Sequence, residues 1–150
     1  MASSPVEPRT RDEVAPLLEA YQAALDAAAA RGARDYGKVF EESPPGLGVH
    51  EIDSGKLYRR VGQGALAILG YRAEDLLGRA VTEFIVMSET AQRAIDKKLT
   101  GVSELRPFVR SFIRADGSSV TMLLLDRHLK DAAGSIVGIR TVFAPIKLEG

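Results

Sequence analysis

The most informative absence in this 150-residue chain is cysteine, which does not occur at all. Without thiols the chain has no disulfide, thiolate nucleophile, zinc-thiolate or iron–sulfur centre, cysteine-bound flavin or other cysteine-linked chromophore. A charge surplus is missing too, because 20 Lys and Arg residues balance 20 Asp and Glu residues. General nucleic-acid binders and binders of anionic membranes usually carry a basic excess, so we expect no nucleic acid and no membrane as partner.

Long apolar stretches are also missing. The longest uninterrupted run has five residues, Ala65–Leu69, whereas a membrane-spanning helix needs about 20, and the first residues lack a signal-peptide pattern. The 45% hydrophobic and 27% charged residues are typical of one folded domain. We therefore expect a single soluble domain with a disordered N-terminus over residues 1–10 and a short tail over residues 147–150.

Residues 11–35 are predicted to form an amphipathic N-terminal helix. Thr10 with Glu13 has the form of a capping box. Pro16 conflicts with such an early start, since proline is tolerated only in the first turn, so the regular helix is predicted to begin within residues 12–15. Its apolar stripe either covers the chain's own domain or forms a homodimer seam, and both can hold at once. The stripe consists of Val14, Leu18, Tyr21, Leu25 and Ala28.

The rest of the chain alternates between strand-like and helical patterns. Apolar alternation flanks the turn residues Asp53-Ser54-Gly55, and glycines separate several short helical segments. This order favours an α+β fold, with one antiparallel sheet and helices on a face. The predicted strands are 47–52, 56–61, 106–115, 120–130 and 135–146, and the predicted short helices are 36–42, 63–69, 73–77, 81–86 and 88–99.

The strand predicted over residues 120–130 carries an unusual run, Met122-Leu123-Leu124-Leu125. A strand with one face in water should alternate between apolar and polar residues. Both faces of this strand are therefore predicted to be covered. The short helices cover one face, and the N-terminal helix stripe or a second subunit covers the other.

Four sequence blocks, in this order and spacing, resemble the PAS family of sensory domains. They are VFEESPPGLGVHEID, ALAILGYRAEDLLGR, RSFIRADGS and LKDAAGSIVGIRTVF, within residues 39–143. The resemblance implies a PAS domain over residues 36–146: a five-stranded antiparallel sheet with short helices on one face. It also implies a non-catalytic sensory or regulatory module of bacterial, cytoplasmic signal transduction, such as a two-component regulatory system.

The chain departs from the family pattern at two places. Gly62 stands where the family usually has Asn, and Ala144-Pro145-Ile146 stands where it usually has an Asp-Ile-Thr-like triplet leading to an output helix. Pro145 lacks an N–H and disfavours continuing the sheet. These departures favour the N-terminal helix over a C-terminal one as the contact element for signalling.

The resemblance also implies a ligand pocket between the sheet's inner face and the short helices. It places Arg140, two residues after Gly138, on that inner face. The same alignment places there Phe108, Arg110, Phe112, Met122, Leu124 and Asp126, and it sets Phe112 opposite Leu124 and Arg110 opposite Asp126. Phe84 and Ile95 are predicted to lie over the pocket.

Three interpretations of this face stay open. Arg110 and Asp126 can be an ordinary cross-strand pair while Arg140 reaches solvent. Alternatively, Arg140, with Arg110, binds an anionic small molecule, because a partly buried guanidinium needs a partner. In the third, the face is a filled apolar core.

Catalytic and cofactor motifs are missing from the sequence. His50 and His128 fall in predicted strands, so we expect structural roles rather than haem ligation, and no metal site. Non-covalent flavin stays open, and no phosphate-binding glycine loop or carboxylate pair suggests an enzyme. The predicted function is a sensor that binds a small molecule or a signalling protein and signals through a dimeric N-terminal helix; the alternative is a ligand-free interaction or dimerisation module.

Overall fold

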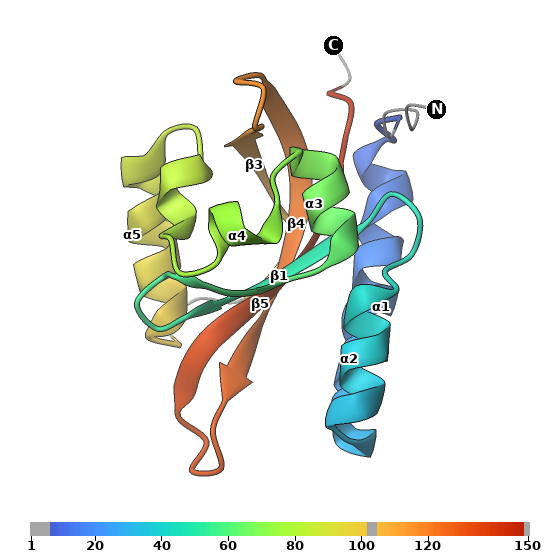
Figure 1. Ribbon diagram of the computed structural model, residues 1–150, viewed down its shortest axis with the longest axis vertical. Coiled ribbons are helices and arrows are strands. Elements are labelled where there is room, and N and C mark those ends of the chain that lie inside the picture. The colour runs from blue at the N-terminus through green and yellow to red at the C-terminus, as the bar shows by residue number, and fades with distance from the viewer. Residues whose placement is uncertain (1–6, 102–104, 149–150) are drawn as a thin grey trace.

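The computed structural model describes residues 7–101 and 105–148. These residues form a five-stranded antiparallel sheet in the order β2-β1-β5-β4-β3, with helices on both faces (Figure 1). The predicted α+β fold is confirmed. The elements are α1 (Arg11–Arg31), α2 (Ala33–Glu41), β1 (Gly48–Asp53), β2 (Tyr58–Val61), α3 (Gln63–Leu69), α4 (Ala73–Leu76), the 3-10 helix η1 (Val81–Phe84), α5 (Ser88–Leu99), β3 (Phe108–Ile113), β4 (Ser119–Lys130) and β5 (Ile136–Pro145).

Helix α1 begins at Arg11, earlier than predicted. Thr10 is its N-cap: the Thr10 Oγ1 accepts from the Glu13 N–H at 3.2 Å, and a Glu13 carboxylate oxygen accepts from the Thr10 N–H at 3.3 Å. These bonds satisfy N–H groups at the helix start and offset the cost of Pro16 in the second turn. Residues 9 and 10 are therefore ordered, and Arg9 also bridges to Ile146; residues 1–6 of the predicted disordered N-terminus lie outside the described residues.

The two N-terminal helices lie together on one face of the sheet, which we call the outer face (Figure 1). Helix α2 begins at Ala33 and so runs across the predicted boundary between residues 35 and 36. The predicted stripe of α1 is buried against outer-face side chains such as Val49, Leu123 and Val142. The stripe thus covers the sheet of its own chain, and the homodimer seam stays a prediction.

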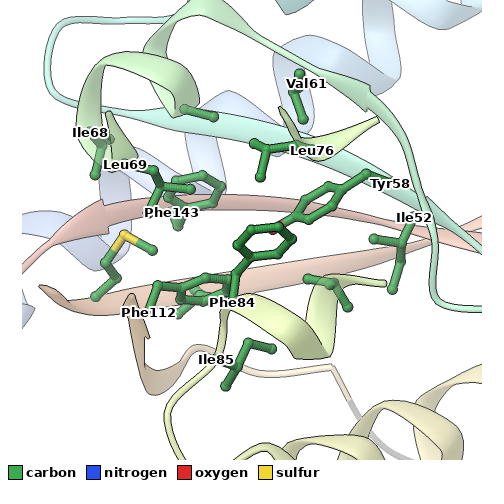
Figure 2. Packing of buried hydrophobic residues seen from close by; sticks show 14 of the residues in the cluster. Ile52, Tyr58, Val61, Ile68, Leu69, Leu76, Phe84, Ile85, Phe112 and Phe143 are labelled. Carbon is green, nitrogen blue, oxygen red and sulfur yellow. The ribbon is translucent and has the colours of Figure 1, made fainter. Parts of the chain in front are cut away.

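The short helices α3, α4, η1 and α5 cover the opposite face, which we call the inner face. Four aromatic rings meet at its centre, Tyr58, Phe84, Phe112 and Phe143 (Figure 2). Strand β4 takes part in both cores, since its even-numbered residues 122 and 124 face the inner core and its odd-numbered residues 123 and 125 face the outer one. The prediction that both faces of this strand are covered is confirmed.

The hairpin of β3 and β4 pairs differently from the prediction. Phe112 stands opposite Val120, and Arg110 stands opposite Met122. The turn centres on residues 116 and 117, where Gly117 has a φ of +87° that favours glycine. Because a side chain changes face with every residue, this even-numbered displacement leaves the predicted faces of the hairpin unchanged.

Candidate functional site

The inner face holds a small enclosed cavity beside α5. Its volume is about 10 Å³, about the space of one water molecule and far below the ~300–1,000 Å³ of typical small-molecule sites. The aromatic core fills the rest of this face, and in this conformation the cavity has no room for a haem or a flavin. Its lining residues are Ile52, Val81, Ile95, Phe112, Leu124 and Ile139, with the polar His50, Arg110, Asp126 and Thr141.

Three of these polar residues form a row across the sheet. His50 of β1 stands opposite Thr141 of β5, which stands opposite Asp126 of β4. The Thr141 hydroxyl donates to Asp126 Oδ1 at 2.7 Å, and Lys98 Nζ of α5 donates to Asp126 Oδ2 at 2.8 Å. His128 Nε2 lies 2.8 Å from the Lys98 carbonyl oxygen. Helix α5 is therefore fastened to the sheet near its C-terminal end by polar contacts.

Two buried polar atoms of the inner core have no hydrogen-bond partner among the described residues, His50 Nδ1 and the Tyr58 hydroxyl. The two rings meet edge to face with centroids 5.1 Å apart. Burial lowers the pKa of His50 to about 4, while the nearby charge of Asp126 acts to raise it. Burial raises the pKa of Tyr58. Unpaired buried polar atoms are rare and costly, and His50 is one of the residues that line the cavity.

Arg110 lies where the inner cavity meets a surface groove of about 310 Å³ between β3 and α5. Its half-buried guanidinium stacks over the Phe108 ring at 4.7 Å. Burial lowers the pKa of Arg110, and Asp126 opposes this effect. None of the side-chain hydrogen bonds within residues 7–101 and 105–148 involves this guanidinium.

The inner-face prediction holds for most of the predicted pocket residues. Phe84, Ile95, Phe112, Met122 and Leu124 are buried in the inner core, and Phe108 packs against it. The structure brings Ile95, Arg110, Phe112 and Leu124 together around the cavity, whereas Phe84 and Met122 are not among its lining residues. A ligand-binding role for any of them stays a prediction.

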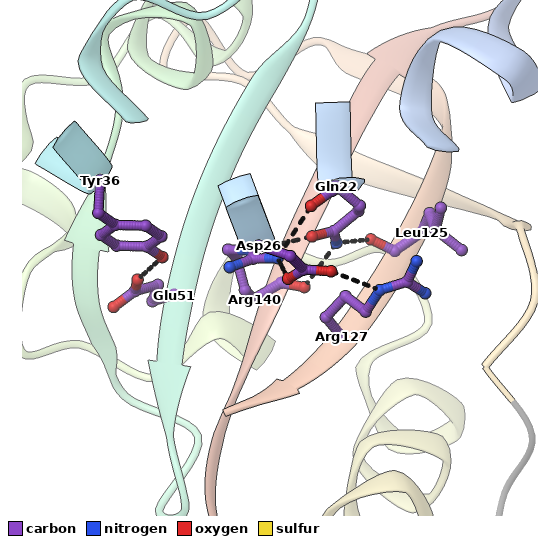
Figure 3. Close-up of polar contacts among 7 residues, drawn as sticks. All are labelled: Gln22, Asp26, Tyr36, Glu51, Leu125, Arg127 and Arg140. Carbon is purple, nitrogen blue, oxygen red and sulfur yellow. Dashed lines mark hydrogen bonds and ion pairs between the residues drawn. The ribbon is translucent and has the colours of Figure 1, made fainter. Parts of the chain in front are cut away.

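Arg140 lies on the outer face, and its predicted inward placement was wrong. Only 3% of its surface is exposed. Its Nε donates to Gln22 Oε1 at 2.8 Å, and its Nη2 forms an ion pair with Asp26, both on α1 (Figure 3). The side chains of β5 alternate, so Thr141 points inward and Arg140 outward. Both faces of this strand mix polar and apolar residues, so its sequence pattern does not distinguish the two orientations.

The α1 residues that bind the Arg140 side chain, Gln22 and Asp26, were not predicted from the sequence. Gln22 is completely buried, and its Nε2 donates to the carbonyl oxygens of Leu125 at 2.8 Å and Arg140 at 3.0 Å. The available signal was spacing, because Leu18, Gln22 and Asp26 recur every four residues and so share one helix face with the stripe. A polar residue on that face requires a polar partner on the sheet.

A second row of charges crosses the outer face beside Arg140. Glu51 of β1 stands opposite Arg140, which stands opposite Arg127 of β4. The Tyr36 hydroxyl of α2 donates to Glu51, and Arg127 Nε lies 3.4 Å from Asp26 Oδ2 (Figure 3). Burial and this bond to Glu51 raise the pKa of Tyr36 to about 12. We call Gln22, Asp26, Tyr36, Glu51, Arg127 and Arg140 the outer network.

The inner row and the outer network stand back to back. In each of three adjacent strands, one residue faces inward and its immediate neighbour in the chain faces outward. One peptide unit therefore separates each inner residue from its outer neighbour. The pairs are His50 with Glu51, Thr141 with Arg140, and Asp126 with Arg127.

The described part of the chain contains no group of three or more His, Asp or Glu side chains able to hold a metal ion. None of its helices is long and apolar enough to cross a membrane.

Comparison with known proteins identifies the fold of this chain. The sequence matches no family model, and no curated protein matches it. Among solved structures, the PAS domain of an HTR-like protein from Haloarcula marismortui is 23% identical, with 85% of this chain and 99% of that one covered and a TM-score of 0.61. A PAS domain from Colwellia psychrerythraea is 14% identical over 75% and 95% of the chains, with a TM-score of 0.66. The PAS domain of the Cronobacter turicensis RpfR quorum-sensing receptor, in complex with BDSF, is 11% identical over 71% and 99%, with a TM-score of 0.58. The chain therefore has the PAS fold.

Proposed function

We propose that this chain is a non-catalytic sensory or regulatory module. A small molecule bound at the inner face, beside α5, shifts the population of conformations in which α1 is docked on the outer face. The observation that carries this proposal is the back-to-back arrangement of the inner row and the outer network. One network touches the cavity, the other holds α1, and three adjacent strands connect them.

Binding requires α5 to move, because the inner cavity is nearly filled. The two ends of α5 are held differently. Lys98 fastens the C-terminal end to Asp126, whereas the N-cap Met87 is 74% exposed, has a φ of +60° and forms no side-chain cap. We expect α5 to swing outward at its N-terminal end, which borders the groove.

The comparisons support a small-molecule ligand only by analogy. The Cronobacter turicensis PAS domain was solved with BDSF bound, and fold likeness does not transfer a ligand. The bacterial, cytoplasmic setting in a two-component system belongs to this proposal as well. So does a signalling protein as partner.

Homodimerisation is part of the proposal, through a different face of α1 than its predicted stripe. The stripe is already buried in its own chain. The exposed side of α1 is rich in alanine and carries Leu17, which is 38% exposed and borders a groove of about 390 Å³ with Pro44 and Pro45. A second copy that packs there would connect the docking of α1 to the partner subunit.

A specific observation favours the alternative of a ligand-free interaction or dimerisation module. The inner core is packed by aromatic rings, and its cavity has room for about one water. A module of this kind would keep the exposed face of α1 as its contact surface and would bind nothing beside α5.

Native mass spectrometry of the purified chain tests both functions, because it reports subunit number and retained ligand together. A retained small molecule supports the sensor, whereas a dimer without added mass that also fails to bind small molecules in titrations supports the ligand-free module. Leu17→Lys should yield monomers, and Leu77→Lys, at a similarly exposed position on the opposite side of the sheet, should not. A wild-type monomer at high concentration would refute dimeric signalling.

A further inference from the structure

The charges around Asp126 do not balance. Lys98 and Arg110 both act on this single carboxylate. Its oxygens are already bonded, one to the Thr141 hydroxyl and the other to Lys98. His50, whose pKa is lowered to about 4, is neutral at pH 7 and adds no charge. Among residues 7–101 and 105–148, the groups around Asp126 thus carry one positive charge in excess, on a half-buried Arg110 guanidinium that has no hydrogen-bond acceptor within those residues.

The groove beside Arg110 is mainly apolar. Valine, methionine and alanine side chains line it, with the polar Thr90 and Ser111, and no acidic side chain lines it in the described part of the chain. Its volume of about 310 Å³ reaches the lower end of typical ligand sites. Met87 and Val86, which line the groove, are 74% and 40% exposed, so an apolar guest that covers them would remove apolar area from water.

We propose that the groove between β3 and α5 binds an amphiphilic monocarboxylate, with its carboxylate on the Arg110 guanidinium and its apolar chain along Val86, Met87 and Ala91 of the groove lining. A carboxylate accepts two parallel hydrogen bonds from a guanidinium and supplies the one missing negative charge. The aliphatic lining favours an alkyl chain over a polar or highly charged ligand. This inference rests on the proposed sensor function and names the ligand class of that site.

Octanoate is the probe, titrated into the full chain and followed by backbone amide shifts in NMR spectra. We expect saturable shifts that are largest in residues 86–94 and 109–111, which line or border the groove. Octanamide has the same chain without the charge and should bind roughly tenfold more weakly or worse, because it loses the charge-assisted bonds.

Two variants separate the roles of the charge and the groove. Arg110→Gln should lower octanoate affinity by roughly tenfold or more, while Arg93→Gln, on an exposed position of α5 outside the groove lining, should leave it unchanged. Ala94→Phe keeps Arg110 and fills part of the groove, so it should also lose octanoate.

The proposal is overturned if the wild-type chain shows no saturable shifts, or if Arg110→Gln binds octanoate as well as wild type. Equal binding of octanoate and octanamide overturns it too. The sensor function survives any of these results if native mass spectrometry finds a different small molecule retained by the chain. It fails together with this inference only if the chain binds no small molecule.

Discussion

Replacing Gln22 by leucine is the sharpest test of how α1 is held on the sheet. Gln22 is the polar residue in the buried stripe of α1, and its side chain bonds to Leu125, to the Arg140 backbone and to the Arg140 guanidinium. Leucine fits a helix and is apolar, so a purely hydrophobic interface would accept it without loss. The bonding pattern predicts the opposite.

The expected loss follows from the partners left behind. Gln22→Leu removes the oxygen that accepts from the buried Arg140 Nε–H. It also removes the amide N–H groups that donate to the carbonyl oxygens of Leu125 and Arg140. An unsatisfied buried group costs about 1–3 kcal/mol, and the added apolar burial of leucine returns part of this. We therefore expect the free energy of unfolding to fall by roughly 2–3 kcal/mol.

Urea unfolding followed by circular dichroism measures this loss, and amide exchange of α1 detects any local release of the helix. Gln92→Leu, at an exposed position on α5, is the matched control and should change stability by no more than about 0.5 kcal/mol. If Gln22→Leu changes neither the urea midpoint nor the α1 exchange, the outer network does not hold α1.

Three further outcomes are expected. Since burial lowers the pKa of His50 from 6.5 to about 4, the unfolded chain binds the proton more readily. The contribution of His50 to stability is therefore present above pH 6.5 and is lost, by about 3 kcal/mol, as the pH drops to 4; urea unfolding across this range should show a shallower slope in His50→Leu than in wild type. Gly64→Ala should destabilise by about 1–3 kcal/mol or more, because the new Cβ would lie 2.2 Å from the Leu47 carbonyl oxygen, and a thermal unfolding midpoint equal to wild type would contradict this packing. Gly37→Ala, also in a helix, meets only the far end of the Arg60 side chain, at 3.2 Å, and should raise the same midpoint if that end shifts by a few tenths of an ångström, in keeping with a gain of up to about 1 kcal/mol.

Much of the fold follows from local sequence signals. Glycines at helix ends mark the bounds of the short helices. Helices α3 and α5 have the predicted bounds, Gln63–Leu69 and Ser88–Leu99. The doubly apolar run of β4 correctly indicated that both faces of this strand are covered. The start of α1 was missed because the capping bonds of Thr10 outweigh the local penalty of Pro16.

The spacing of Gln22 and Asp26 indicates a polar patch on α1, but the partners within the polar networks could not be predicted, because they depend on strand register and on distant contacts. Arg140 contacts Gln22 and Asp26, more than 110 residues earlier in the chain. A strand covered on both faces has no polar side to reveal its orientation, so one residue of misplacement moves Arg140 to the wrong face. The shifted pairing of β3 with β4 is of the same kind, since it depends on where Gly117 turns the chain.

The central claim is that the inner row and the outer network are coupled through the sheet. Asp126→Asn changes a side chain of the inner row only. The amide exchange rates of residues 14–28 report how firmly α1 is held on the outer face. Asp96→Asn, which removes an exposed ion pair between Asp96 of α5 and Lys56, is the control. The account predicts that α1 exchange accelerates about fivefold or more in Asp126→Asn, beyond any change in β4, and stays unchanged in Asp96→Asn. Equal α1 exchange in wild type and Asp126→Asn would contradict the coupling.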